Sequence, residues 1–303
     1  MKHFWLFLKG LAMGAADVVP GVSGGTIAFI TGIYTELLDS IKSINLNAVR
    51  LLFSQGAAAA WRAINGTFLL VLGSGILLAL LSLAKVLHYL LLHHAVWLWS
   101  FFFGLIIASS WHVGKEIQHW NISRVVTLVS GAAIAALISQ LSPSSVEPTA
   151  LIIFVAGSIA ICAMILPGIS GSFILLLMGL YEPVLAAVKA LELDTMALFA
   201  LGAGLGLLLF SRLLSWCLHH YKDLMFALLT GFMLGSLVKV WPWKETLSTR
   251  LNSKGEVVPF IQSNQCPGSE QPELLLLAAG LMLAGGGLVL LLEKVAGSGQ
   301  KSA

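Results

Sequence analysis

Charged residues are scarce in this sequence. Only 10% of its 303 residues are Asp, Glu, Lys or Arg, whereas 58% are hydrophobic and the mean hydropathy is +0.92. A soluble domain carries roughly 25% charged residues, so this chain has too few to cover a water-exposed surface. Its longest apolar runs approach the ~20 residues that a helix needs to cross a bilayer, and they lack the alternation of barrel strands. The sequence therefore predicts an all-α polytopic membrane protein.

Cysteine is also rare, and the signals of several common ligands are missing. The three cysteines show no CxxC or other metal-ligand spacing, so neither a disulfide framework nor a metal site is expected. No basic run indicates nucleic acid. The glycine-rich stretch "GVSGGT" lacks the lysine of a nucleotide-binding P-loop. We therefore expect no metal, no cofactor and no nucleic-acid partner.

What the sequence does contain is an unusual stretch near its start, "DVVPGVSGGT" at residues 17–26. One interpretation is the end of a signal peptide, because basic residues precede an apolar run and Gly14-Ala15-Ala16 resembles a cleavage site. However, "PGVSGGTIAFITGIYTELL" (20–38) aligns without gaps with "PGISGSFILLLMGLYEPVL" (167–185). A cleaved signal has no reason to recur in mid-chain, so the motif belongs to the mature fold.

The repetition continues in the same order along the chain. Residues 72–82 ("LGSGILLALLS") match 201–211 ("LGAGLGLLLFS"), and 101–110 ("FFFGLIIASS") match 228–237 ("LLTGFMLGSL"). We therefore expect one membrane domain made of two repeats, 1–145 and 146–295, followed by a polar tail at 296–303. Each repeat has two apolar arms around its PGxSG break, as a re-entrant or hairpin pair, and then three transmembrane helices. The expected apolar segments are 4–18, 22–40, 66–87, 95–113 and 123–140 in the first repeat, and 149–166, 169–188, 196–217, 224–240 and 273–293 in the second, with long polar connections at 41–65 and 241–272.

The two arms decide the topology. If both arms lie on the same side, each repeat crosses the membrane three times, and the two repeats are inverted relative to each other. If the broken segment crosses once, the repeats are parallel. Positive charges favour cytoplasmic loops, and the inverted arrangement with a cytoplasmic N-terminus puts most Lys and Arg inside. The exceptions, which lie mostly in or beside one long loop, are Lys189, Lys239, Lys244, Arg250 and Lys254.

The motif has the chemistry of an anion site. Irregular backbone inside a bilayer survives only in packed protein or beside a wet cavity. A helix that begins near Ser23 would present free amides, two hydroxyls and its positive dipole end to an anion. Interrupted helices at equivalent places in two repeats are typical of a transporter's substrate site. The residues expected to bind substrate here are Ser23, Gly24, Gly25 and Thr26, with Ser170, Gly171 and Ser172 in the second copy, and those expected to support the breaks are Pro20, Gly21, Pro167 and Gly168.

A second interpretation of the glycines is close helix packing. Gly21/Gly25 and Gly202/Gly206 also fit the small-xxx-small spacing of packed membrane helices. For Gly73, Gly75, Gly202, Gly204 and Gly285–Gly287, close packing is the favoured interpretation.

Ionisable residues within spans are candidate functional groups. Arg212 in "LLLFSRLLSWCL" could hold a phosphate with two hydrogen bonds, and Lys85 is a second candidate cation. For both, the alternative is that the side chain extends to the membrane interface. In the alignment of the two repeats, Asp17 stands opposite Met164. This difference between the copies suits a role for Asp17 in coupling transport to an ion or proton. Glu36 and Glu182 follow the two breaks and could support the motifs or lie at the interface.

The segments "AADVVPGVSGGTIAFITGIY", "LPGISGSFILLLMGLYEPVL" and "LTGFMLGSLVKVWPW" carry a resemblance to a known family. Over essentially its whole length, the chain resembles the bacterial polyprenyl-phosphate (undecaprenyl-phosphate) transporters. The resemblance implies a flippase that returns this lipid carrier from the outer to the inner leaflet of the cytoplasmic membrane, for synthesis of peptidoglycan and other envelope polymers. It also implies that the motif residues named above, with Asp17, are the functional ones. The second copy departs from the pattern at Ser172 and Met164.

Two other functions stay open at this point. One is a secondary transporter or channel for a small soluble anion. The other is a membrane enzyme such as a lipid phosphatase, against which the sequence shows no recognisable acid, base and nucleophile set. We therefore expect a transporter that is not an enzyme, with polyprenyl phosphate and the bilayer as partners. The sequence leaves open whether it forms a homodimer.

Overall fold

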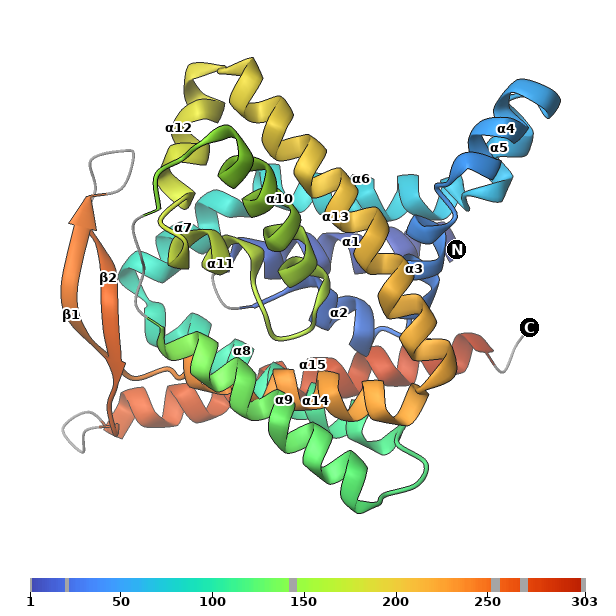
Figure 1. The fold of residues 1–303 in the computed structure, drawn as a ribbon. Coiled ribbons are helices and arrows are strands. Elements are labelled where there is room, and N and C mark those ends of the chain that lie inside the picture. The colour runs from blue at the N-terminus through green and yellow to red at the C-terminus, as the bar shows by residue number, and fades with distance from the viewer. Residues whose placement is uncertain (1, 20–21, 142–145, 252–256, 268–271, 301–303) are drawn as a thin grey trace.

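The computed structural model describes residues 2–19, 22–141, 146–251, 257–267 and 272–300. Helices make up most of it, with one small β-hairpin (Figure 1). The helices are α1 (Lys2–Val18), α2 (Gly24–Ile30), α3 (Tyr34–Lys42), α4 (Leu46–Gln55), α5 (Ala57–Ala63), α6 (Gly66–Ser82), α7 (Ala84–His93), α8 (Ala95–Lys115), α9 (Ile122–Gln140), α10 (Ala150–Ile165), α11 (Gly171–Leu177), α12 (Tyr181–Ala190), α13 (Leu193–His220), α14 (Lys222–Val240) and α15 (Pro272–Gln300). The strands are β1 (Lys244–Leu251) and β2 (Val257–Asn264).

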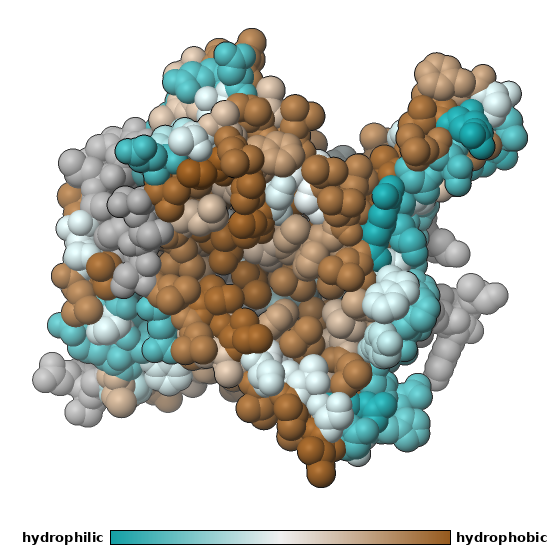
Figure 2. Space-filling view, in the orientation of Figure 1, coloured by the Kyte–Doolittle hydropathy of each residue, from teal (hydrophilic) through white to brown (hydrophobic). Residues whose placement is uncertain are grey.

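The molecule has two distinct ends. The β-hairpin lies at one end, and both chain termini and helices α4 and α5 lie at the other (Figure 1). We call these the hairpin end and the terminal end. Figure 2 shows hydrophobic residues over the middle of the molecule, with hydrophilic residues gathered toward the two ends. An exposed apolar surface of this size is typical of contact with lipid.

The lengths of the helices confirm the prediction of a polytopic helical membrane protein. Within the described residues, five helices are long and apolar enough to span a bilayer. Two further pairs, α5 with α6 and α11 with α12, are bent by 71° and 108°. The five spanning segments are 95–115, 122–140, 193–220, 222–240 and 273–291.

The connection at 241–272 was expected to be an exposed loop, and this prediction is wrong in part. Strands β1 and β2 pair antiparallel from Lys244 opposite Asn264 to Leu251 opposite Val257, with an irregularity near Ser248. The paired segments "KETLSTRL" and "VVPFIQSN" contain the β-branched residues that favour strands. The fold is therefore mainly, and not entirely, α-helical.

Several predicted segments are also divided more finely than expected. The arms 22–40 and 169–188 are each two short helices, because Gly32 and Gly179 adopt positive φ values of 72° and 71° and end α2 and α11. The segment 66–87 ends at Ser82 and is followed by α7. The connection 41–65 forms α4 and α5, and α15 continues through Gln300 into the predicted tail.

Four helix pairs build the scaffold. Helix α1 packs along α6, and α10 packs along α13. Helix α8 of the first half packs along α15 of the second, while α9 packs along α14. In each pair a glycine lies against a carbonyl oxygen of the partner helix, as Gly75 does on Phe7 and Gly202 on Phe154. The two halves of the chain are therefore intertwined through their last helices.

These contacts distinguish two glycines of α13 and yield a prediction. A Cβ at Gly202 would overlap the carbonyl oxygen of Phe154, whereas a Cβ at Gly204 would meet open space. We expect Gly202→Ala to lower the free energy of unfolding by about 1–3 kcal/mol through overpacking. Gly204→Ala should be neutral or stabilise by up to about 1 kcal/mol, because alanine favours helix. Thermal unfolding of both variants in detergent measures this, and equal effects would contradict it.

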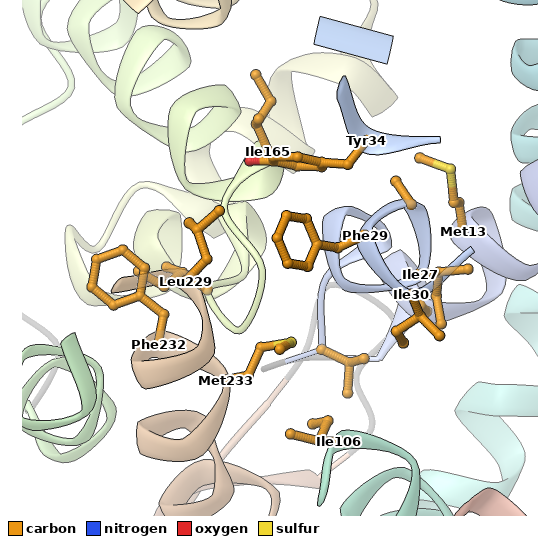
Figure 3. Close-up of a cluster of buried hydrophobic side chains, with 14 of the residues drawn as sticks. Met13, Ile27, Phe29, Ile30, Tyr34, Ile106, Ile165, Leu229, Phe232 and Met233 are labelled. Carbon is orange, nitrogen blue, oxygen red and sulfur yellow. The ribbon is translucent and has the colours of Figure 1, made fainter. Parts of the chain in front are cut away.

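The short helix α2 lies in the centre of the core. All seven of its residues are buried. The Phe29 ring lies 4.9 Å from Tyr34 and 5.1 Å from Phe226, measured between ring centroids. Figure 3 shows Ile165, Leu229 and Met233 of the second half around the same cluster. The first motif therefore lies where the two halves meet.

Candidate functional site

The first motif is held by its own side chains. The Asp17 carboxylate accepts a hydrogen bond from the Gly24 amide at 2.7 Å, and the Ser23 hydroxyl accepts one from the Gly25 amide at 3.0 Å. An acid and a hydroxyl are the groups that a helix N-terminus favours. An external anion would therefore reach these amides only by displacing Asp17 and Ser23. Pro20 and Gly21, also predicted here, lie outside the described residues.

The second motif binds directly to the first. The Gly168 amide donates a hydrogen bond to the Thr26 hydroxyl at 3.0 Å, and the Ser23 hydroxyl donates one to the Met164 carbonyl at 2.6 Å. Gly168 has a φ of 83°, and a Cβ there would lie 2.6 Å from the Phe232 carbonyl oxygen, so only glycine fits. These two bonds lock the PGxSG motifs together at the middle of the molecule. We call them the motif interlock.

The serines of the second motif are arranged differently from those of the first. Ser170 precedes α11 but its side chain accepts no bond from the helix amides. Its hydroxyl instead lies 3.0 Å from that of Ser172. Ser170, Gly171 and Pro167 are buried, and Ser172 is partly exposed. The two copies are therefore chemically unequal, as the sequence difference at Ser172 and Met164 suggests.

The structure does not bring the predicted cations to the motifs. On α13 the buried face carries Ser211, Leu214, Ser215 and Leu218, so Arg212 falls on the exposed face. Lys85 is exposed on α7. These positions suit side chains that extend to an interface.

The predicted glutamates also lie away from the motif interlock. Glu36 on α3 is exposed and accepts a hydrogen bond from Asn65 at 3.1 Å. Glu182 is partly buried in the first turn of α12. Among the predicted acids, Asp17 is therefore the one that contacts a motif.

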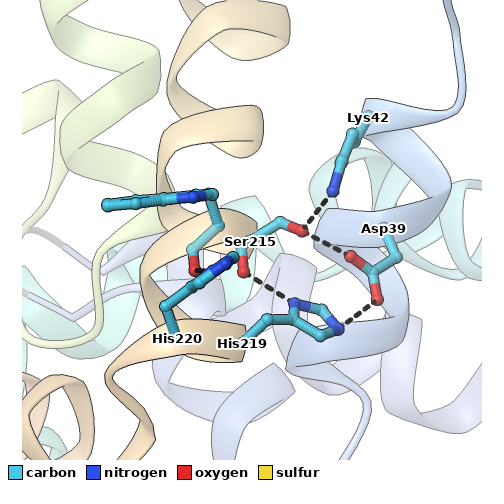
Figure 4. Close-up of polar contacts among 6 residues, drawn as sticks. Asp39, Lys42, Ser215, His219 and His220 are labelled. Atoms are coloured by element: carbon cyan, nitrogen blue, oxygen red, sulfur yellow. Dashed lines mark hydrogen bonds and ion pairs between the residues drawn. The ribbon is translucent and has the colours of Figure 1, made fainter.

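A polar cluster that the sequence analysis missed joins α3 to α13 at the terminal end (Figure 4). The Ser215 hydroxyl donates to Asp39 at 2.6 Å and accepts from the Lys42 ammonium at 3.1 Å. The His219 ring nitrogen lies 3.7 Å from the other Asp39 oxygen. We call these four residues the α3–α13 latch, and Asp39, Lys42 and His219 of the latch line a cavity of about 590 Å³. Asp39 and Ser215 are 176 residues apart, and no local pattern links them.

A second cavity, of about 420 Å³, lies at the hairpin end. The ends of α9 and α14, helix α11 and strand β2 form its walls, and Lys239 and Lys244 both line it. Burial and the neighbouring charge of Lys239 lower the pKa of Lys244 to about 7. From the sequence, both lysines were expected only as charges in or beside an outer loop. The available signal was a pair of lysines flanking the aromatic end of a span, "KVWPWK".

The chain is similar to proteins of known family. A family model described as "undecaprenyl phosphate translocase-like" matches residues 13–258. The polyprenyl-phosphate transporter of Vibrio cholerae is 54% identical over 301 residues, covering 98% of each chain. The polyprenyl-phosphate transporter of Staphylococcus aureus is 38% identical over 262 residues, covering 80% of this chain and 88% of its own. No solved structure matches the chain. By the length of the family match and the identity to these relatives, this chain belongs to the undecaprenyl phosphate translocase-like family.

Proposed function

We propose that this protein moves polyprenyl phosphate, and undecaprenyl phosphate in particular, from the outer to the inner leaflet of the bacterial cytoplasmic membrane. The names of its relatives support this substrate, and recycling of the lipid carrier for envelope polymers would be the purpose. A phosphate is costly to move through hydrocarbon, whereas the prenyl tail can stay in the bilayer. The task of the protein is therefore to solvate the head group. It carries out no bond cleavage in this proposal.

The observation that carries the proposal is the motif interlock. Two helices broken at equivalent motifs meet in the core, bonded through Ser23 to Met164 and through Thr26 to Gly168. Broken helices that meet between two repeats are where transporters bind their substrates. The substrate path therefore passes the residues of the two motifs. We retain the motif serines, glycines and Thr26 as the proposed site, with Asp17 as the group that occupies the α2 amides until substrate arrives.

The packing also supports two structural repeats, which we propose are inverted. Phe7 and Phe154, which receive Gly75 and Gly202, are separated along the chain by the same number of residues as Pro20 and Pro167. The pair α8 and α15 likewise matches the pair α14 and α9. In this correspondence Gly75 matches Gly202, whereas the sequence alignment places Gly75 opposite Gly204. An inverted pair with a cytoplasmic N-terminus would put the hairpin end outside the cell.

Alternating access explains the difference between the two ends. The α3–α13 latch holds the terminal end closed. Each end has a cavity, but the latch joins the two walls of the one at the terminal end, whereas the one at the hairpin end, lined by Lys239 and Lys244, adjoins the second motif through Phe173. The described conformation is then the one that receives lipid from the outer leaflet. Opening of the latch and closing of the hairpin end would release the lipid inside.

Reconstituted vesicles test the function. We expect vesicles that contain the protein to expose all of their undecaprenyl phosphate to a phosphatase added outside, whereas empty vesicles expose only the lipid of the outer leaflet. The physical reason is that the head group does not cross a lipid bilayer unaided on this timescale. Equal cleavage in both vesicle types, with folded protein, would refute the proposal.

Two control measurements separate the alternative functions. Uptake of labelled inorganic phosphate, without lipid movement, would indicate a transporter of soluble anions. Phosphate release from the lipid without added phosphatase would indicate an enzyme. Lipid movement with neither signal is the result that we expect.

A further inference from the structure

The cavity at the hairpin end concentrates positive charge without a carboxylate to balance it. Lys239 and Lys244 both line it, and no Asp or Glu is among its described lining residues. The Lys244 ammonium donates a hydrogen bond to the backbone carbonyl oxygen of Lys239 at 2.6 Å, which brings the Lys244 side chain to the end of α14, where Lys239 lies. Both are partly buried. Two like charges in such a place repel each other, and an anion between them would relieve the repulsion.

Each lysine is held in position by an aromatic ring. The Lys239 ammonium lies 4.2 Å from the centre of the Phe173 ring, and the Lys244 ammonium lies 4.0 Å from the centre of the Trp99 ring. A ring stabilises an ammonium without neutralising it, unlike a carboxylate. Phe173 also directly follows Ser172, so the cavity adjoins the second motif.

The rest of the lining suits an amphipathic ligand. Neutral donors surround the lysines, and apolar side chains lie beside them. A further cavity of about 230 Å³ shares Lys244 and Gln262 with the first and is lined by Trp99 and Trp243. The neutral donors and acceptors of the first cavity are Ser139, Gln140, Gln262, Ser263 and Asn264, and its apolar residues are Leu141, Phe173, Leu176, Val238 and Ile261.

We propose that Lys239 and Lys244 form a receiving site for a phosphate monoester, which binds the head group of the prenyl lipid before it reaches the motif interlock. The inference rests on the proposed function for the identity of the lipid. The phosphate accepts hydrogen bonds from the two ammonium groups, and the first prenyl units lie against the aromatic and aliphatic lining. Charge-assisted bonds of this kind are the strong ones, so both lysines should contribute to affinity.

Binding to the purified, full-length protein in detergent tests the site. The ligands are undecaprenyl phosphate, the uncharged prenyl alcohol with the same tail, and inorganic phosphate. We expect undecaprenyl phosphate to raise the melting temperature of the wild-type protein, and the alcohol to have little effect. The double variant Lys239→Gln/Lys244→Gln should bind the phosphate lipid about tenfold more weakly or worse. The double variant to arginine should retain binding, because it keeps both charges.

A matched control is Lys189→Gln, which removes one positive charge from the end of α12 without touching the cavity. Its binding and transport should equal those of the wild type. Vesicle transport by the double variant Lys239→Gln/Lys244→Gln should fall in proportion to its loss of affinity for the phosphate lipid. Its melting temperature in the absence of ligand should equal that of the wild type. If the double variant binds and transports the lipid as well as the wild type does, the two-lysine site is overturned, while the proposed function stands.

The same experiments also show whether the proposed function fails while the two-lysine site stands. If the wild-type protein moves no lipid, yet binds inorganic phosphate in a way that the glutamine variant loses, then the proposed function fails and the two-lysine site stands. If the alcohol binds as well as the phosphate lipid, the lysines do not recognise the head group and the site is overturned.

Discussion

A covalent link between α3 and α13 should stop transport almost completely. The structure holds these helices together through Asp39, Lys42 and Ser215, and alternating access requires them to part. We expect a protein with Asp39→Cys and Ser215→Cys, joined by a short thiol-reactive cross-linker, to lose nearly all lipid movement in vesicles. A cleavable cross-linker should allow recovery on reduction. The three native cysteines, Cys162, Cys217 and Cys266, are replaced beforehand.

Two controls isolate the effect of the link. Each single cysteine variant, treated with the same reagent, should keep its untreated rate. A second linked pair, Trp61→Cys with Thr67→Cys, joins α5 to α6. The native side chains of Trp61 and Thr67 are already hydrogen-bonded to each other at 3.0 Å. That link should leave transport intact, because it lies within one unit of the fold. Full transport by the linked Asp39 and Ser215 pair would rule out movement of α3 from α13.

Removal of the motif interlock should destabilise the whole protein. The change Ser23→Ala removes a helix cap, worth about 1 kcal/mol, and Thr26→Val leaves the buried Gly168 amide without its partner, at a cost of about 1–3 kcal/mol. We expect the double variant to unfold at a clearly lower temperature in detergent and to move little lipid. Scanning calorimetry or tryptophan fluorescence measures the first effect, and the vesicle assay measures the second.

Thr31→Val is the matched control for the interlock. Thr31 is also buried, but its hydroxyl bonds the Ile27 carbonyl within its own helix, where the Thr31 amide already donates. Its loss should therefore cost much less than that of Thr26. The single variant Ser23→Ala separates the two roles of Ser23. A normal melting temperature with weak lipid binding would assign Ser23 to the ligand, in place of the structural role that its bonds indicate.

The positively charged residues illustrate how far sequence reasoning extends. Arg212 was the favoured phosphate ligand because it lies in an apolar run, yet its helix buries the opposite face. Lys239 and Lys244 were counted as charges in or beside a loop, yet the end of α14 and the start of β1 bring both to one cavity. A helical period predicts which residues share a face. It does not predict which of the faces lies against protein, because that depends on partners far along the chain.

Asp17 illustrates the same limit within a correctly located motif. The sequence placed an acid beside a break that should attract anions. In the structure this acid accepts the Gly24 amide itself. The Asp17 carboxylate, seven residues before Gly24, therefore occupies an amide that the sequence assigned to an external anion.

The sequence by itself determined the membrane class, the approximate position of the apolar segments, and the duplicated motif that breaks them. These features are local: they follow from the length of apolar runs and from the backbone preferences of proline and glycine. The tertiary structure alone decided that the two motifs bond to each other, that α3 is latched to α13, and that two lysines line one cavity. Each of these depends on residues far apart in the chain, which only the packing of helix against helix brings together.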